Sequence, residues 1–177
     1  MMQINSESDI IEELNSALTV RSFFNIVVRR ITQSIDALIQ RIFRKDELTV
    51  TTVVDSLLNK SGPLGELSDQ LKLLFGIGIV PEGIYHNIED IIRLQKNLNN
   101  DINEHTFTDD YVIYSLKEMS FFSRLGLPSS FDSFTLDDDI SDELRQLQMQ
   151  RQQQIIKSGL SLVIVDICEH LDNCCIQ

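Results

Sequence analysis

Residues 20–43 read VRSFFNIVVRRITQSIDALIQRIF, and this stretch decides the expected fold. Its apolar residues recur at steps of three and four, a spacing that gathers them on one face of a helix. The resulting stripe consists of Phe24, Val27, Val28, Ile31, Ile35, Leu38, Ile39 and Ile42. The stretch therefore predicts a long amphipathic helix that packs on other elements through this face.

The rest of the chain has few residues that break helices, with seven glycines and three prolines in 177 residues. Helical spacing predicts further helices at about residues 8–17, 48–58, 64–75, 81–99, 111–121 and 141–172. A strand is the rival interpretation of 48–58, which is rich in Thr and Val, although its apolar spacing fits a helix better. We predict an all-α fold, a single-domain multi-helix bundle over residues 1–177 with a long C-terminal helix.

The predicted C-terminal helix changes character along its length. Residues 143–154 are polar on almost every side, whereas residues 160–171 are apolar on almost every side. We expect this helix to begin exposed and to end buried. Gly159 lies inside it and predicts a close approach of another helix. The Gln-rich first half is either an oligomer seam or a solvated arm.

The charge of the chain argues against general affinity for nucleic acid. Twenty-seven acidic and fifteen basic residues give a formal net charge of -12, and DNA phosphates would repel such a chain outside a local basic patch. Such a patch lies on the helix of residues 20–45, which contains six basic residues and only one acidic residue, Asp36. The bases are Arg21, Arg29, Arg30, Arg41, Arg44 and Lys45. This face is either solvated or binds an anionic partner or nucleic acid.

An acidic region spans residues 101–145, with eleven acids against three bases. It contains the run Asp137, Asp138 and Asp139 before the long helix. This run can serve as a helix start and aid solubility, because acids suit the positive end of a helix dipole. It can also be an acidic docking surface for a basic protein, or for the basic helix of a second copy.

The sequence predicts no catalytic residue, no metal site and no cofactor. The three histidines lack the spacing of a zinc site, although His170 and Cys174 lie one helical turn apart near Cys168. No glycine-rich phosphate loop or serine nucleophile motif is present. Residues 93–97, RLQKN, are similar to the Arg-Asn region of small helical ribonucleases of the HEPN superfamily, but the histidine of that motif is displaced.

The start of the sequence holds no apolar run, and the most apolar stretch, residues 160–168, is too short to cross a membrane. The three cysteines, Cys168, Cys174 and Cys175, cluster near the end rather than forming a spaced disulfide framework. We therefore expect a soluble, cytoplasmic protein that does not associate with a membrane.

The central third of the chain carries a family resemblance. Residues 61–65 read SGPLG, residues 71–79 read LKLLFGIGI, and residues 85–93 contain Tyr-His followed by IEDIIR. These motifs resemble the mannitol operon repressor family of bacteria over about residues 20–170. The resemblance implies an α-helical fold and a role in repressing hexitol uptake and use. The shared motifs are structural, and the resemblance assigns no functional residue.

Three functions compete at this point. The first is a transcriptional regulator that represses by binding a protein, for example a DNA-binding protein or a sugar-uptake component. The second is a repressor that reads DNA directly with the basic helix of residues 20–45. The third is a sensor of a hexitol or hexitol phosphate held between helices, with Arg29 and Arg30 as first candidates for a phosphate. Self-association stays open in each case.

Overall fold

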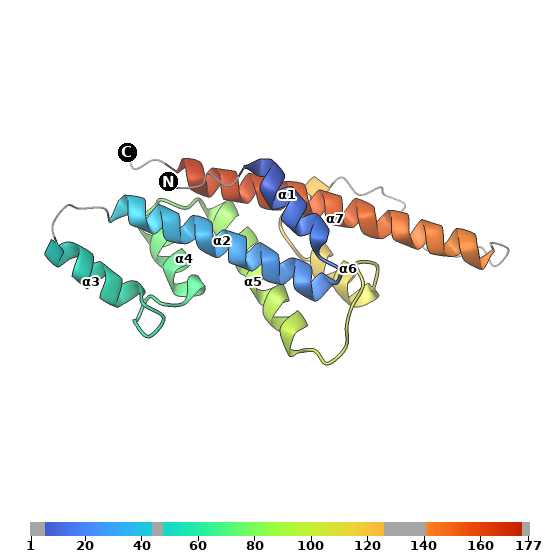
Figure 1. Ribbon diagram of the computed structural model, residues 1–177, viewed down its shortest axis with the longest axis horizontal. Helices are drawn as coiled ribbons and strands as arrows, with labels where there is room; N and C mark the ends of the chain where they lie inside the picture. Colours follow the sequence, from blue (N-terminus) through green and yellow to red (C-terminus); the bar gives the residue numbers. More distant parts are fainter. Residues whose placement is uncertain (1–5, 44–47, 126–140, 175–177) are drawn as a thin grey trace.

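The computed structural model describes residues 6–43, 48–125 and 141–174, and every regular element within these ranges is a helix (Figure 1). This confirms the all-α prediction, including a helix rather than a strand at residues 48–58. None of the described helices is long and apolar enough to span a membrane. The elements are α1 (Glu7–Ser16), α2 (Val20–Ile42), α3 (Leu48–Leu58), α4 (Leu67–Gly76), α5 (Glu82–Asn100), α6 (Asp110–Lys117), the 3-10 helix η1 (Phe122–Leu125) and α7 (Asp142–Asn173).

Short polar side chains decide where several helices begin. The sequence predicts this first helix from about residue 8, but α1 begins at Glu7 and its N-cap is Ser6. Its hydroxyl accepts a hydrogen bond from the Asp9 backbone N–H at 3.3 Å, and the Asp9 carboxylate accepts from the Ser6 N–H at 3.1 Å. This reciprocal pair satisfies two N–H groups that the helix itself leaves free. Thr19 and Ser22 form the same arrangement at the start of α2.

Two helix boundaries differ from the sequence prediction by three residues or more. Helix α4 begins three residues later than expected, because residues 59–65 form a tight turn against the end of α3. There the Leu64 N–H bonds to the Leu57 carbonyl at 2.9 Å, and a Cβ on Gly62 would lie 2.4 Å from the Ser56 carbonyl oxygen. Helix α6 ends at Lys117 rather than near residue 121. Past the last turn of α6, the backbone hydrogen bonds join residues three apart rather than four apart, and this pattern continues into η1.

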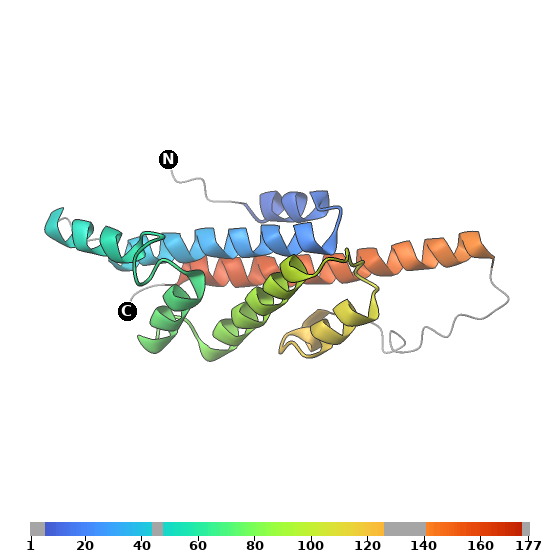
Figure 2. The ribbon, with the colours of Figure 1, turned by 90° about the horizontal axis from the view of Figure 1, so that it is seen from below.

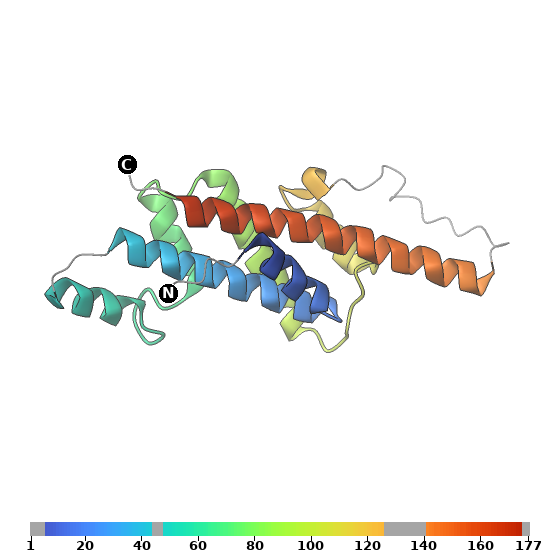
Figure 3. The same cartoon turned by 45° about the horizontal axis from the view of Figure 1, so that its top comes forward.

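Helices α2 and α7 form the centre of the bundle and lie side by side (Figure 2). Helix α1 covers one side of this pair and contacts both members (Figure 3). Helix α5 crosses α2 on the other side, and α4 packs against α5 and α2. Helices α4 and α5 thus form a packed helical hairpin. Helix α3 extends from one end of the molecule, and the first half of α7 extends from the other.

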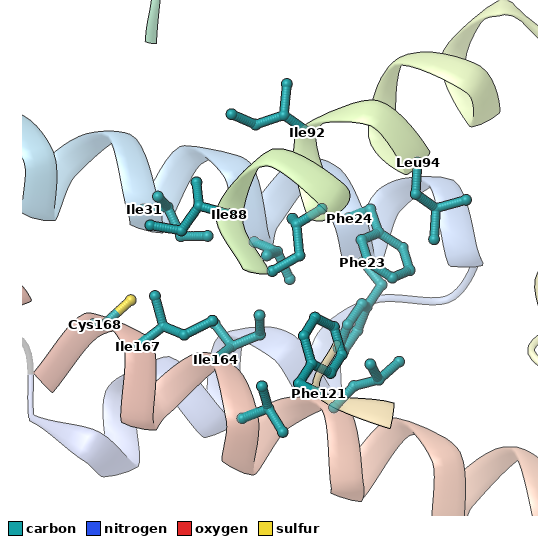
Figure 4. Packing of buried hydrophobic residues seen from close by; sticks show 14 of the residues in the cluster. Phe23, Phe24, Ile31, Ile88, Ile92, Leu94, Phe121, Ile164, Ile167 and Cys168 are labelled. Atoms are coloured by element: carbon teal, nitrogen blue, oxygen red, sulfur yellow. The ribbon is translucent and has the colours of Figure 1, made fainter. Parts of the chain in front are cut away.

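The core lies where α2, α5 and α7 meet, and Figure 4 shows their side chains interlocking there. Phe23 and Phe24 of α2 are fully buried, and their rings meet edge to face at a centroid distance of 5.5 Å. Phe107 of the α5–α6 connection packs on Phe23 in the same way at 5.3 Å. Edge-to-face geometry suits aromatic rings because the positive edge of one meets the negative face of another.

Helix α7 begins exposed and ends buried, as predicted from its composition. Its buried residues start at Ile156 and continue to Leu171, whereas Leu144 and Leu147 of the first half are exposed. Gly159 confirms the expected close approach. The backbone of η1 passes so near that a Cβ on Gly159 would lie 2.7 Å from the Leu125 carbonyl oxygen. Only glycine allows this distance without displacing η1.

Candidate functional site

The four described arginines of α2 bind groups of this same chain. Arg21 donates hydrogen bonds to the carbonyl oxygens of Asp101 at 2.7 Å and Asn103 at 3.1 Å, and it pairs with Glu104 at 3.1 Å. It thereby ties the connection between α5 and α6 to the start of α2. Charge-assisted hydrogen bonds of this kind are stronger than neutral ones, so Arg21 holds that connection in place.

The other three arginines hold α1 and α7. Arg29 and Arg30 both pair with Glu13 of α1. Arg41 donates to the Leu171 carbonyl oxygen at 2.8 Å, near the negative end of α7. The predicted basic surface therefore has four members with structural partners, while Arg44 and Lys45 lie outside the described residues. Its role in binding anions or a partner stays a prediction.

The acidic run Asp137, Asp138 and Asp139 lies outside the described residues, so its proposed docking role also stays a prediction. The first part of the acidic region is described and is organised around His105. Its Nε2 lies 2.8 Å from Asp101 Oδ2, and its Nδ1 lies 3.3 Å from Asp109 Oδ2. The side chain is only 15% exposed. One imidazole thus joins the end of α5 to the start of α6.

This arrangement shifts the pKa of each partner. The hydrogen bond with Asp101 raises the pKa of His105 above its ordinary value, and the hydrogen bond with Asp109 raises it further. Burial acts in the opposite direction, because it disfavours the charged imidazolium, but the pKa stays raised. The pKa of Asp101 is lowered by His105 first, then by the Asn103 N–H and the nearby Arg21. Burial alone would raise the pKa of Asp109, but hydrogen bonds from Thr106 and His105 outweigh burial and lower this pKa.

We expect replacement of His105 by glutamine to destabilise the protein in a pH-dependent way. Because the folded-state pKa is raised, the stabilisation is fully present below the unfolded value of 6.5 and disappears as pH rises through the folded pKa. Urea denaturation of both proteins across this range measures the effect. The difference in free energy of unfolding should be largest on the acidic side of pH 6.5 and shrink above it. A difference that is constant with pH would contradict this assignment.

A groove between α5 and α6 is the best candidate for binding a partner. Its volume is about 360 Å³, and its floor includes the buried side chains of Leu94 and Met119. Two tyrosines of α6 form its rim, with Tyr111 40% exposed and Tyr114 67% exposed. We call this hollow the partner groove, and its full lining is Asp90, Arg93, Leu94, Asn97, Tyr111, Tyr114, Ser115, Glu118 and Met119.

Charged side chains stand around this aromatic rim. Arg93 pairs with Asp90 one helical turn away on α5, and both face the groove. Glu118, at the end of α6, contributes an exposed carboxylate from the opposite side. The Ser120 hydroxyl donates a hydrogen bond to the Asn87 side-chain oxygen and ties the turn after α6 to α5. Such a site can hold a basic side chain between aromatic rings and carboxylates.

The amino-acid sequence alone does not reveal this groove. The signal was present, because Asp90, Arg93 and Asn97 share one face of α5, and Tyr111, Tyr114 and Glu118 share one face of α6. Spacing along a helix shows which residues share a face, but it does not show that two faces meet. In the sequence, Tyr111 and Tyr114 therefore do not differ from ordinary surface residues.

The described cysteines near the C-terminus, Cys168 and Cys174, lie in different surroundings from His170. Cys168 is buried, and burial raises the pKa of its thiol to about 11. Cys174 donates to the Ile79 carbonyl oxygen, with a sulfur–oxygen distance of 3.7 Å, while His170 is exposed. In the described part of the chain, no three His, Cys, Asp or Glu side chains are grouped to hold a metal ion.

Comparison with known proteins identifies relatives over most of the chain. A family model described as "Mannitol repressor" matches residues 6–172. The mannitol operon repressor of Escherichia coli K12 is 34% identical over 161 residues, which cover 91% of this chain and 80% of that protein. Fumarase E of the same organism is 27% identical over 106 residues, which cover 59% of this chain and 63% of that enzyme.

A solved structure gives the same result in three dimensions. The X-ray structure of the MtlR–HPr complex from Escherichia coli matches with a TM-score of 0.83 and 34% sequence identity. The match covers 94% of this chain and 98% of the other. Family model, sequence identity and tertiary structure agree, and the chain belongs to the mannitol repressor family.

Proposed function

We propose that this chain regulates a hexitol operon by binding a protein, without catalysing a reaction, and that its partner is the HPr protein of its own cell. The solved complex of the related Escherichia coli protein with HPr supports the choice of partner. The observation that carries the proposal within this chain is the partner groove, where exposed tyrosines and carboxylates surround an apolar floor.

The chemistry of the groove favours a basic side chain of the partner as its central contact. Tyr111 and Tyr114 offer flat aromatic faces that attract a cation, and Tyr114 is exposed enough to be covered on binding. Glu118 supplies a carboxylate beside them. Aromatic residues in such positions commonly carry a large share of the binding energy at protein interfaces.

The charge of the whole chain supports the same choice. With a net charge of -12, the chain attracts the basic face of a partner over a longer distance than the contact itself. This attraction acts mainly on the association rate and weakens as salt is added. We expect the affinity for the partner to fall with rising ionic strength.

The test is a calorimetric titration of the full chain with purified HPr. We expect Tyr114→Ala to weaken binding at least about tenfold, because the ring is lost from the interface. Tyr114→Phe keeps the ring and should bind nearly as well as the original chain. Glu118→Gln should weaken binding and reduce its dependence on salt. Glu12→Gln removes the same charge from an exposed position on α1 and is the matched control.

The proposal fails if HPr does not bind, or if Tyr114→Ala and Glu118→Gln bind as tightly as the control. Direct DNA reading by α2 predicts a different result, namely a sequence-specific mobility shift with operator DNA and no other protein present. We expect no such shift, because α2 lies at the centre of the bundle and its described arginines already have partners.

The similarity to Fumarase E makes an enzyme the other alternative to be tested. We expect the purified chain to leave the absorbance of fumarate unchanged. Measurable consumption of fumarate that a single substitution abolishes would contradict a function limited to binding.

A further inference from the structure

A second hollow lies between α4 and α5. It borders the same exposed face of α5 as the partner groove does. Its volume is about 320 Å³, within the range of pockets that hold small molecules. Arg93 and Asn97 line both this hollow and the partner groove. We call it the α4–α5 hollow, and its lining is Ser68, Glu89, Ile92, Arg93, Lys96 and Asn97.

The side chains in this hollow leave positive charge and a hydroxyl available. Among the residues that the structure describes, Lys96 forms no ion pair and the Ser68 hydroxyl makes no hydrogen bond. The carboxylate of Glu89 instead accepts a hydrogen bond from the Tyr85 hydroxyl at 2.6 Å. The lining therefore carries two cations, Arg93 and Lys96, and one carboxylate, Glu89, in a chain whose overall charge is strongly negative.

Arg93 can change its partner within this arrangement. Its pairing with Asp90 joins side chains three residues apart, with 69% of the arginine side chain but only 17% of the aspartate side chain accessible to solvent. Because the guanidinium is largely in water, solvent screens this pair and limits its contribution to stability. An anion held by both Arg93 and Lys96 offers the guanidinium a doubly charged partner, which binds it more strongly than one carboxylate does.

We propose that the α4–α5 hollow binds a small phosphate monoester that carries hydroxyl groups. The phosphate lies between Arg93 and Lys96 and accepts a hydrogen bond from the Ser68 hydroxyl. The hydroxyl groups of the ligand bond to the Asn97 amide and the free oxygen of Glu89. This places a phosphate ligand at the start of α4 rather than at Arg29 and Arg30, which are held by Glu13.

Binding in this hollow also changes the partner groove. When the phosphate draws Arg93 away, the carboxylate of Asp90 loses its cation and the groove becomes more negative. A basic side chain of a partner is then held more tightly, so the ligand strengthens partner binding. This coupling rests on the proposed function, whereas binding of the phosphate ester does not.

The first experiment is calorimetric titration of the full chain, without a partner, with mannitol 1-phosphate, mannitol and inorganic phosphate as probes. We expect saturable binding of mannitol 1-phosphate, at least about tenfold weaker binding of inorganic phosphate, and none of mannitol. Lys96→Met should weaken the binding of mannitol 1-phosphate at least about tenfold. Lys72→Met is the matched control, because it removes the same charge from an exposed position on α4 outside the hollow.

No binding of mannitol 1-phosphate overturns the proposal, and so does an equal effect of the two lysine substitutions. The second experiment repeats the HPr titration with the hollow saturated by mannitol 1-phosphate. HPr should bind several-fold more tightly to the original chain, with no such gain in Asp90→Asn. If HPr does not bind at all, the proposed function fails while the first titration still decides the phosphate site. If HPr binds equally with and without the ester, the coupling is wrong.

Discussion

Replacing Gly159 with alanine is expected to lower the free energy of unfolding by about 1–3 kcal/mol, although alanine is the better helix former by about 1 kcal/mol. The added methyl group would lie 2.7 Å from the Leu125 carbonyl oxygen and 3.5 Å from the Cα of the same residue. These are backbone atoms, so no side-chain rotation relieves the overlap. Either η1 moves away from α7 or the helix bends, and both lose buried contacts.

Gly83→Ala is the matched control for this prediction. Gly83 lies in the first turn of α5, and a Cβ there would meet nothing within 4 Å. The same substitution should therefore stabilise the protein by up to about 1 kcal/mol through helix propensity alone. Urea denaturation followed by far-ultraviolet circular dichroism measures both variants. If both shift stability in the same direction, the close approach of η1 is not what requires glycine at residue 159.

Replacing Phe23 with alanine should have the larger effect, a loss of about 3–5 kcal/mol. The ring is completely buried in α2 and contacts the rings of Phe24 and Phe107 edge to face. Its removal leaves a cavity where α2 meets the α5–α6 connection and also removes both ring contacts. Because domains of this size are stable by only about 5–15 kcal/mol, the variant should unfold at much lower urea concentration.

Phe75→Ala provides the comparison, since the same atoms are removed from a ring that is 38% exposed and stacks on Tyr85 at a centroid distance of 4.4 Å. We expect Phe75→Ala to lower the free energy of unfolding far less than Phe23→Ala does. Should Phe23→Ala fail to fold, Phe23→Leu gives a measurable intermediate loss. Equal losses in Phe23→Leu and Phe75→Ala would show that Phe23 does not hold the centre of the bundle.

The sequence was sufficient for most helices because their determinants are local. The apolar stripe of residues 20–43 predicted α2 almost to the residue, and the polar and apolar halves of residues 141–172 predicted where α7 enters the core. Local rules were less accurate at boundaries. A helix was expected from about residue 8, whereas the hydroxyl of Ser6 caps α1 and the helix begins at Glu7. The early end of α6 depends on the turn that brings η1 against α7.

The roles of charged residues could not be predicted in the same way. The six bases of residues 20–45 predict one basic surface, because the sequence shows their number but not their partners. In the fold, Glu13 lies beside Arg29 and Arg30, and the backbone of residues 101–103 lies beside Arg21. Each of these contacts joins groups that are 16 to 82 residues apart.

The sequence by itself determined that this protein is a helical bundle, that its long last helix begins exposed and ends buried, and that another element approaches Gly159. These features follow from helical periodicity and from the small size of one residue, both of which act over a few turns. Only the tertiary structure decided which arginines hold the bundle together and that α5 and α6 enclose a groove with Tyr114 at its rim. Those features depend on how distant helices cross, and the periodicity within each helix carries no information about that crossing.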